Sequence, residues 1–505
     1  MSKSSNAVSA STPFKYIFGF ALGGSSYTVL FNAMMAFALI FYTQVLGLDY
    51  VLAGLALSIT TFWDAVSDPV MGHISDNTKS RYGRRHPYVL FGGIAMVVFF
   101  FLLWAIPGWI TGSWALFTYL LIVNFLFRTA LTVFMIPYGA LGFEVCTDYD
   151  GRCKLQATAS VLGMGVNFFA IALGWRIFFP DRGEVDGTQF ASNYFNMGLT
   201  FAIVSLGLVL FSIFATRRYI TDTRSSQDLE GNNLRAFFED FKDILVDKRA
   251  KIVFLFFGAV QIGNVFTACF QAYVWIYFMK FTDWEKTVCH SIGMVFFVLG
   301  SLVCTQLSKK MDKKAAVCVG AGLSIITSAL LILIFYTGAM APDVKVAIPE
   351  GAAFFAGKSL SISLLVFSLL QGIYWMGTGI MSPLAASMIA DISEINKHET
   401  GLLKDGSYSA VYSFIMKAII ALGLFLQGFI LKLVGFKEGS EDQSPEAVER
   451  LVLVAFVTAI IFAVVALRLA MKYPINRTYM LKIKKELAER QTNEADRTDQ
   501  GNPNI

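Results

Sequence analysis

Apolar stretches about 20 residues long recur along this whole chain and limit what it can fold into. A helix needs about 20 such residues to cross a hydrocarbon layer of about 30 Å. Only 15% of the residues are charged, whereas soluble domains carry about 25%. The sequence therefore predicts an all-α polytopic membrane protein with about twelve transmembrane helices, near 16–46, 51–75, 87–107, 115–140, 155–178, 196–216, 251–279, 288–308, 315–338, 359–390, 408–434 and 449–471.

The twelve spans form two sets of six around a polar stretch. Short related motifs follow the second and eighth spans, and Pro137 and Pro383 lie in the fourth and tenth. Such weak repeats are typical of two-halved transporters. We expect an N-terminal half at 1–216, a cytoplasmic linker at 217–250, a C-terminal half at 251–473 and a cytoplasmic tail at 474–505. Apolar spacing from Leu234 to Leu245 predicts an amphipathic linker helix, lying in the headgroup plane or against the ends of the spans.

Basic residues gather in alternate loops. The loops after the second, fourth, sixth and eighth spans carry Lys and Arg, whereas those near 47–50 and 108–114 carry none. Basic loops stay on the cytoplasmic side, so we expect both termini there, in a plasma membrane that in a prokaryote is the inner membrane. The net charge of +5 gives no indication of nucleic-acid binding.

Four ionisable residues fall inside predicted spans, namely Asp64 and Asp68 in the second, Arg128 in the fourth and Lys417 in the eleventh. Such groups are costly in a membrane and usually functional. Counting residues at about 1.5 Å each places Asp64, Arg128 and Lys417 near one mid-membrane layer. One interpretation is a static cluster of ion pairs. The other is a site in which Asp64 binds a cation or substrate hydroxyls, with Lys417 or Arg128 as its counter-charge when the site is empty.

Polar and aromatic residues at mid-span predict the lining of a cavity for a hydroxyl-bearing solute. Each is also compatible with a contact between helices. The chain has four His and no HExxH motif, and its six cysteines stand singly. We therefore expect no enzyme, metal, disulfide or cofactor. The lining candidates are Tyr27, Asn32, Trp63, Asn167, Gln261, Asn264, Gln271, Gln371, Tyr374 and Trp375.

Several motifs resemble the glycoside–pentoside–hexuronide:cation symporter family of the major facilitator superfamily. The most specific is Trp63-Asp64-Ala-Val-Ser-Asp68-Pro69 followed by Arg81-Tyr-Gly-Arg84-Arg85-His-Pro87. Ile136-Pro137-Tyr138, Asp148-Tyr-Asp-Gly-Arg152, Ala390-Asp391 and the Gly406-Ser-Tyr408-Ser stretch before Lys417 agree with it. The resemblance spans both halves and implies a major facilitator fold of two six-helix halves.

The resemblance also implies roles. Asp64 and Asp68 match the cation-site acids of the family, and Lys417 matches a lysine of its charged centre. Their mid-span positions, and not the resemblance, lead us to expect substrate contacts from Arg128, Tyr27, Trp63, Asn32, Gln371, Trp375, Gln261 and Asn264. The motif around Asp76 matches a cytoplasmic gate, for which the candidates are Gly72, Asp76, Arg81, Arg84, Arg85, Glu144, Asp148, Arg152 and Asp391.

Departures from melibiose permease, a familiar member, limit what can be transferred. Thr28 and Met135 stand where that protein has acids, and Ala159 or Ser160 where it has a basic residue. This favours H⁺ over Na⁺ as the coupling ion, and the additional Arg128 suggests an acidic sugar such as a uronide. We expect a monomeric, cation-coupled sugar, glycoside or hexuronide symporter that works by alternating access. The alternatives are a carrier of lipid-like or drug-like amphiphiles and a membrane sensor without transport.

Overall fold

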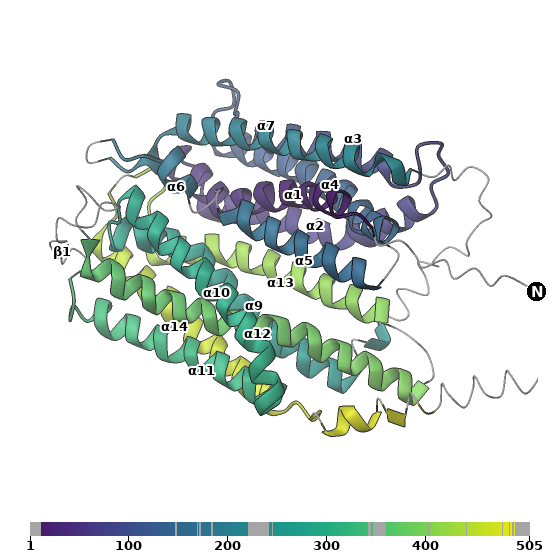
Figure 1. The fold of residues 1–505 in the computed structure, drawn as a ribbon. Helices are drawn as coiled ribbons and strands as arrows, with labels where there is room; N and C mark the ends of the chain where they lie inside the picture. Colours follow the sequence, from purple (N-terminus) through teal and green to yellow (C-terminus); the bar gives the residue numbers. More distant parts are fainter. Residues whose placement is uncertain are drawn as a thin grey trace, which may run out of the picture. The chain divides into compact units, whose positions relative to one another are not determined.

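The computed structural model consists almost entirely of long helices (Figure 1). It forms two compact units. Unit 1 contains residues 1–232, 268–291 and 420–451, and unit 2 contains 233–267, 292–419 and 452–505. The structure describes residues 12–489 except 147–148, 169, 171–172, 183–184, 221–241, 245, 342–344, 347–359, 401–404, 441, 477, 484 and 487–488.

Eleven helices in the described part are long and apolar enough to cross a membrane. In the N-terminal region the long helices are α1 (Phe14–Ile40), α2 (Tyr50–Asp76), α3 (His86–Trp104), α4 (Ser113–Val145) and α7 (Ala191–Thr216). The later ones are α9 (Lys248–Tyr273), α10 (Asp283–Met311), α11 (Lys313–Leu331), α12 (Ile362–Thr400), α13 (Asp405–Val434) and α14 (Pro445–Met471).

The predicted fifth span, 155–178, falls on two helices. These are α5 (Tyr149–Asn167) and the short α6 (Leu173–Phe178). Residues 169, 171 and 172 between them lie outside the described part. Most of the predicted linker helix, together with 490–505 of the tail, also lies outside it. The boundaries of the predicted halves therefore stay a prediction.

Shorter elements extend some of the long helices. Segments of π-helix continue three of them, at Phe41–Val45 after α1, Val274–Phe278 after α9 and Ile332–Tyr336 after α11. Short 3₁₀ helices lie at Gly187–Gln189 and Arg217–Tyr219. Strands β1 (Lys345–Val346) and β2 (Leu360–Ser361) pair antiparallel, with Lys345 opposite Ser361.

In unit 1, α1 packs against α5 and α7, α2 against α4, and α3 against both α4 and α7 (Figure 1). Small residues permit these close approaches. A Cβ at Gly92 of α3 would lie 2.8 Å from the Phe134 amide nitrogen of α4, and one at Gly198 of α7 would lie 2.6 Å from the Trp104 ring. We call the end where α1 ends and α2 begins the α1/α2 end, and the opposite end the α2/α3 end.

In unit 2, α11 packs against α12 around an apolar core. Phe257 of α9 stacks on Tyr412 of α13, with ring centroids 5.0 Å apart. The tail contributes to this core, because Ile475, Met480 and Ile483 are buried in it. The part of the tail that the structure describes is thus packed onto the helices.

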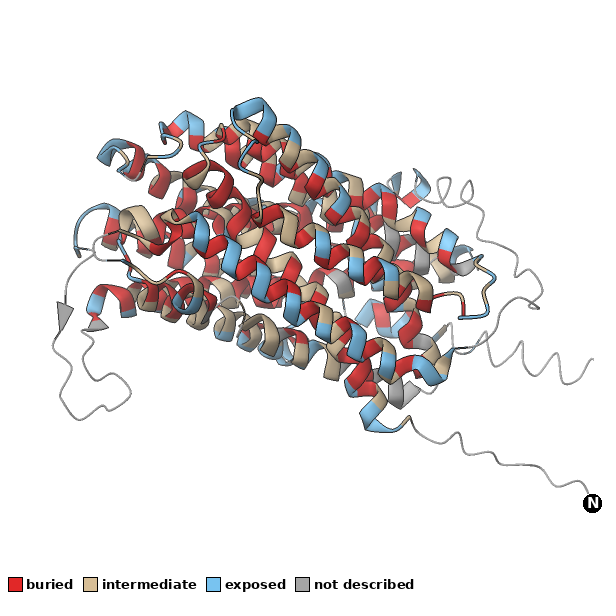
Figure 2. Ribbon diagram, turned by 90° about the horizontal axis from the view of Figure 1, so that it is seen from above, coloured by how far each residue is buried: buried red, intermediate tan, exposed pale blue. Residues whose placement is uncertain are grey.

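Large apolar side chains remain exposed along the outward faces of the helices, where Figure 2 shows exposed and intermediate residues alternating with buried ones. Phe91 on α3 is 69% exposed and Ile203 on α7 is 63% exposed. Water would disfavour such surfaces, whereas lipid solvates them. The fold is that of a multi-pass membrane protein.

Asp49 begins α2 as its N-cap. Its carboxylate accepts hydrogen bonds from the amides of Val51 (2.9 Å) and Leu52 (3.1 Å) and pairs with Lys432. Partial burial alone would raise the pKa of the Asp49 carboxyl. The Lys432 ammonium and the two amides outweigh burial, so this pKa lies below its ordinary value. The ionised carboxylate therefore stabilises the folded state.

Replacing Asp49 by alanine is expected to destabilise the protein by about 0.5–2 kcal/mol, because α2 loses its cap. Asp49→Asn should cost less, since asparagine also caps helices. A lowered pKa means that the stabilisation is present above the ordinary Asp value near 3.9 and disappears as pH falls through the folded-state value. Thermal unfolding at pH 7 and at pH 3 checks this; a difference between wild type and Asp49→Ala that persists undiminished at pH 3 would contradict it.

Candidate functional site

A buried ion pair joins α2 and α4 in unit 1. The Arg128 Nη1 atom donates to Oδ2 of Asp64 over 2.7 Å, and the two residues are only 1% and 5% exposed. Arg128 Nη2 donates to the Thr61 hydroxyl over 3.0 Å, and its guanidinium lies 5.1 Å from the centroid of the Phe31 ring. The structure thus brings together two of the residues that the sequence placed in one layer.

Small hydroxyl side chains extend this contact along both helices. Thr132, one turn after Arg128, donates to Oδ1 of Asp68 over 3.0 Å and lies 3.1 Å from the Ser67 hydroxyl. Residues three or four apart share one helix face, so Asp64, Ser67 and Asp68 all face α4. The result is a polar strip of two carboxylates, one guanidinium and several hydroxyls.

Trp63 and Asn124 bound this polar strip. The Trp63 indole nitrogen donates to Thr129 over 3.0 Å, and its ring lies 4.8 Å from that of Phe125. Toward the α1/α2 end, Asn124 donates to Thr60 over 2.6 Å. The Trp63 indole therefore contacts Thr129, the residue next to Arg128. Both of these contacts are with α4, which fixes the position of the indole.

Sequence reasoning missed Thr61, Ser67, Thr129 and Thr132. The signal for them is spacing, since each lies within four residues of Asp64 or Arg128 on its own helix. The Pro69 ring adds a local feature, because proline has no amide hydrogen to donate to the Ala65 carbonyl. The polar strip thus lies where the helical hydrogen-bond pattern of α2 is interrupted.

The other lining candidates of unit 1 are Tyr27 and Asn32 on α1, Asn167 on α5 and Gln271 on α9. Asn32 donates to Asn167 of α5 over 2.9 Å. Tyr27 stacks on Phe31, whose ring faces the Arg128 guanidinium. Thr28, which stands where melibiose permease has an acid, bonds to the Gly24 carbonyl of its own helix.

The remaining predicted lining residues belong to unit 2. Asn264 donates to Gln261 on the same helix over 3.0 Å, and Gln371 is buried within α12. The Trp375 ring lies 5.6 Å from that of Tyr374, and the Tyr374 hydroxyl accepts from Thr267. Lys417 lies on α13. Their roles in a common site stay a prediction.

Three of the predicted gate residues of unit 1, Arg84, Arg85 and Glu144, meet at the α2/α3 end. Glu144 at the end of α4 accepts from Arg84 Nε over 3.1 Å, and its Oε1 lies 2.9 Å from Nη1 of Arg85. Arg81 stacks over Tyr82, and Gly72 faces Ile136. The side chains of Asp76 and Arg152 and the whole of Asp148 lie outside the described residues. In unit 2, Asp391 pairs with Lys313.

The α1/α2 end of unit 1 is tightly closed. A Cβ at Gly428 of α13 would lie 2.1 Å from the Tyr50 carbonyl oxygen, and one at Gly54 would lie 2.8 Å from the Leu424 carbonyl oxygen. Gln44 donates to the Tyr50 hydroxyl and accepts from Tyr277. Backbone therefore lies against backbone here, with polar contacts beside it.

A cluster of charges ties Asp181 and Asp186, in the chain between α6 and α7, to the start of α10. Lys286 is fully buried and pairs with Asp186, with Oδ1 of Asp181 3.9 Å away. Arg176 pairs with Asp283, whose amide donates to Asp181 over 3.0 Å. Together these contacts hold two chain segments that are 100 residues apart in sequence.

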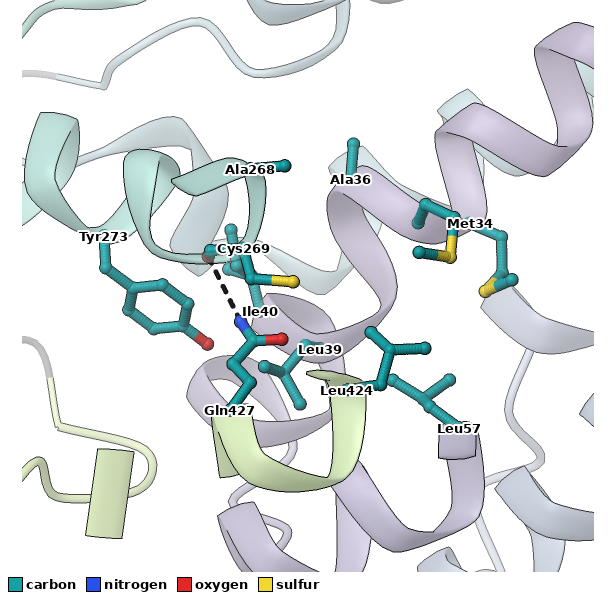
Figure 3. Close-up of a pocket in the computed structure, with 11 residues that line it drawn as sticks. Met34, Ala36, Leu39, Ile40, Leu57, Ala268, Cys269, Tyr273, Leu424 and Gln427 are labelled. Carbon is teal, nitrogen blue, oxygen red and sulfur yellow. Dashed lines mark hydrogen bonds between the residues drawn. The ribbon is translucent and has the colours of Figure 1, made fainter. Parts of the chain in front are cut away.

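A small pocket lies between the α1/α2 end of unit 1 and the Asp64–Arg128 ion pair. Its volume is about 20 Å³, room for about one water molecule. Figure 3 shows Met34, Leu57 and Leu424 around it, with Gln427 bonded to the Cys269 carbonyl oxygen. Met35 lines the pocket and also contacts Arg128 Nη2 through its sulfur. A sugar does not fit here, so this side of the ion pair is closed.

Comparison with known proteins places the chain in a family. The family "MFS/sugar transport protein" matches residues 19–477. The inner membrane symporter YicJ of Escherichia coli is 24% identical over 93% of this chain and 94% of its own length. The isoprimeverose transporter of Lactiplantibacillus pentosus is 23% identical over 84% and 81%. The solved structure of a mutant of the nucleoside transporter NupG has a TM-score of 0.59 at 12% identity, covering 91% of this chain and 98% of that one.

These matches define a membrane transporter with the major facilitator fold, not an enzyme. The chain belongs to the MFS/sugar transport protein family, and within it to the glycoside–pentoside–hexuronide:cation symporters. This confirms the resemblance found in the sequence, and with it a cation-coupled sugar symporter.

Proposed function

We propose that this protein imports a sugar, glycoside or hexuronide together with H⁺ or Na⁺, and that Asp64 is the coupling site. The buried Asp64–Arg128 pair carries the proposal. A fully desolvated ion pair is a weak stabiliser, yet its charges can exchange partners. Charges inside a membrane helix usually serve transport. A cation that binds Asp64 therefore changes the electrostatics of the whole polar strip.

Either coupling ion can use the groups present. A proton needs only one carboxylate. Sodium needs several oxygen atoms, and Asp64, Asp68, Ser67 and Thr132 offer carboxylate and hydroxyl oxygens within one turn of α2 and its contact with α4. This oxygen-rich arrangement supports Na⁺ more than the sequence alone did, so both ions belong in the test.

The substrate side of the proposal rests on the family and on the lining residues. Tyr27, Trp63 and Asn32 provide the aromatic faces and hydrogen-bonding groups that suit a sugar. The Arg128 guanidinium is already engaged by Asp64, Thr61 and Phe31. An acidic sugar thus has to compete with Asp64 for it, and the preference for uronides stays a hypothesis for the same experiment.

For the setting of the protein we propose a plasma membrane, which in a bacterium is the inner membrane, with both termini in the cytoplasm and the chain acting as a monomer. The basic loops support this orientation. The α1/α2 end of unit 1 is then the extracellular end. Its close packing supports alternating access with that side shut, while Arg84, Arg85 and Glu144 serve as part of the cytoplasmic gate.

The test is uptake of a labelled sugar panel into proteoliposomes under an imposed proton or sodium gradient. The panel contains neutral sugars, glycosides and a uronide. We expect one class to accumulate against its gradient under one of the two ions. Accumulation of none, together with transport of an amphiphile by the same vesicles, would replace the sugar proposal by the amphiphile carrier. Binding of a sugar without counterflow would indicate a sensor.

A further inference from the structure

We propose that Arg128 is a built-in substitute for the coupling cation. It holds Asp64 in the empty carrier, sets how tightly the cation binds, and allows the empty carrier to return. The inference rests on the proposed function and deepens it, because it assigns to Arg128 a role in the cycle other than contact with the sugar.

The geometry makes Arg128 and a cation competitors. Arg128 Nη1 lies 2.7 Å from Oδ2 of Asp64, so a cation at this oxygen meets a like charge unless the guanidinium withdraws. Arginine cannot relieve this repulsion by losing its proton, because its side chain stays protonated in proteins. A cation therefore gains Asp64 only by displacing Arg128.

Two groups near Arg128 can stabilise its guanidinium after a cation has displaced it from Asp64. The Phe31 ring already faces it and stabilises a cation through its π electrons. Asp68 lies one helical turn from Asp64 on the face that contacts α4, bonded to Thr132. A shift of the guanidinium by about one turn would exchange one carboxylate for another.

The empty carrier needs such a substitute. A symporter must return without its cation, and Asp64 is then a nearly fully buried carboxylate. An uncompensated charge at this depth strongly disfavours the return step. Arg128 compensates it. With a neutral side chain at position 128, no guanidinium competes with the cation for Asp64, so the cation would bind more tightly and stay bound.

The first experiment measures cation binding without any sugar. Purified wild type and Arg128→Gln are titrated with NaCl, and separately with acid, while thermal unfolding is followed. We expect half-maximal stabilisation of Arg128→Gln at a cation concentration about tenfold lower or less, equivalent to about 1.4 kcal/mol. Asp64→Asn/Arg128→Gln should lose the response, and Arg182→Gln, at an exposed position, should titrate like wild type. An unchanged or weakened cation affinity in Arg128→Gln would overturn the proposal.

The second experiment separates exchange from net uptake, using the sugar that the panel identifies. Arg128→Gln should exchange labelled for unlabelled sugar when the cation is present on both sides, because exchange needs no empty return. Its gradient-driven net uptake should fall at least tenfold, and Arg128→Lys should recover part of it. Loss of exchange and of net uptake together would show that Arg128 binds the sugar instead.

The outcomes for wild type keep the two proposals apart. If wild type shows neither a cation response nor sugar accumulation, the proposed function fails. If wild type accumulates sugar and Asp64→Asn does not, but Arg128→Gln behaves like wild type, the proposed function stands and only the role of Arg128 fails.

Discussion

Replacing Asp64 by asparagine is expected to reduce gradient-driven sugar accumulation to the level of vesicles without protein. Asparagine has nearly the same shape and still offers an oxygen to Arg128 and to its neighbours on α4. It cannot take up a proton, and it contributes no negative charge to a sodium site. The cation then loses its main ligand, and uphill transport loses its driving force.

The control for Asp64→Asn is the same substitution at the start of the same helix. Asp49→Asn keeps the N-cap of α2 and an oxygen that Lys432 can bond at the α1/α2 end, and it lies outside the polar strip, so it should accumulate sugar at close to the wild-type level. Equal amounts of both variants in the vesicles, with matching elution profiles in detergent, exclude a folding defect. Undiminished accumulation by Asp64→Asn would remove this carboxylate from the mechanism.

The second large effect is expected at Gly428. The Cβ of a valine there would lie 2.1 Å from the Tyr50 carbonyl oxygen, so the α1/α2 end cannot close as it does in the structure. Overpacking of this kind costs about 1–3 kcal/mol, which would favour the open form of this end by roughly five- to 150-fold. Because alternating access requires closure at each end in turn, net uptake should fall by a similar factor.

Thiol labelling reports the opening directly. Cys269 lines the pocket beneath the closed end. A membrane-impermeant maleimide, added on the side that the proposed orientation makes extracellular, should therefore label it faster in Gly428→Val when the other cysteines are replaced by serine. The control is Gly322→Val on α11, where a Cβ would meet nothing within 4 Å. Wild-type transport and labelling in Gly428→Val would show that this close approach is not part of the cycle.

Hydropathy predicted most of the fold because it detects the solvent around each helix. The second span, predicted at 51–75, is observed at Tyr50–Asp76. Hydropathy fails to predict the ends of helices that extend beyond the hydrocarbon layer. The tenth span was predicted to end at 390, but α12 continues through polar residues to Thr400, with Lys397 and His398 in its last turn. Polar residues beyond the membrane do not stop a helix, so hydropathy alone misses such ends.

The site was predictable only in its charged members. Asp64 and Arg128 stand out because an ionisable residue in an apolar span is rare, and their depth along α2 and α4 predicted that they would meet. Thr61 gives no such signal, because a hydroxyl in a helix usually satisfies itself, as Thr61 does with the Leu57 carbonyl. The closure at Gly428 depends on which helix faces α2. Only tertiary structure provides that information.

The charge cluster around Lys286 has a practical consequence. Because the described residues around Asp181 and Asp186 are tied to the start of α10, the two segments present one discontinuous epitope instead of two independent peptides. An antibody raised against the folded protein at this site would not recognise the denatured chain on a blot. It would bind only while the two segments remain joined, and would therefore report whether they stay joined during the transport cycle.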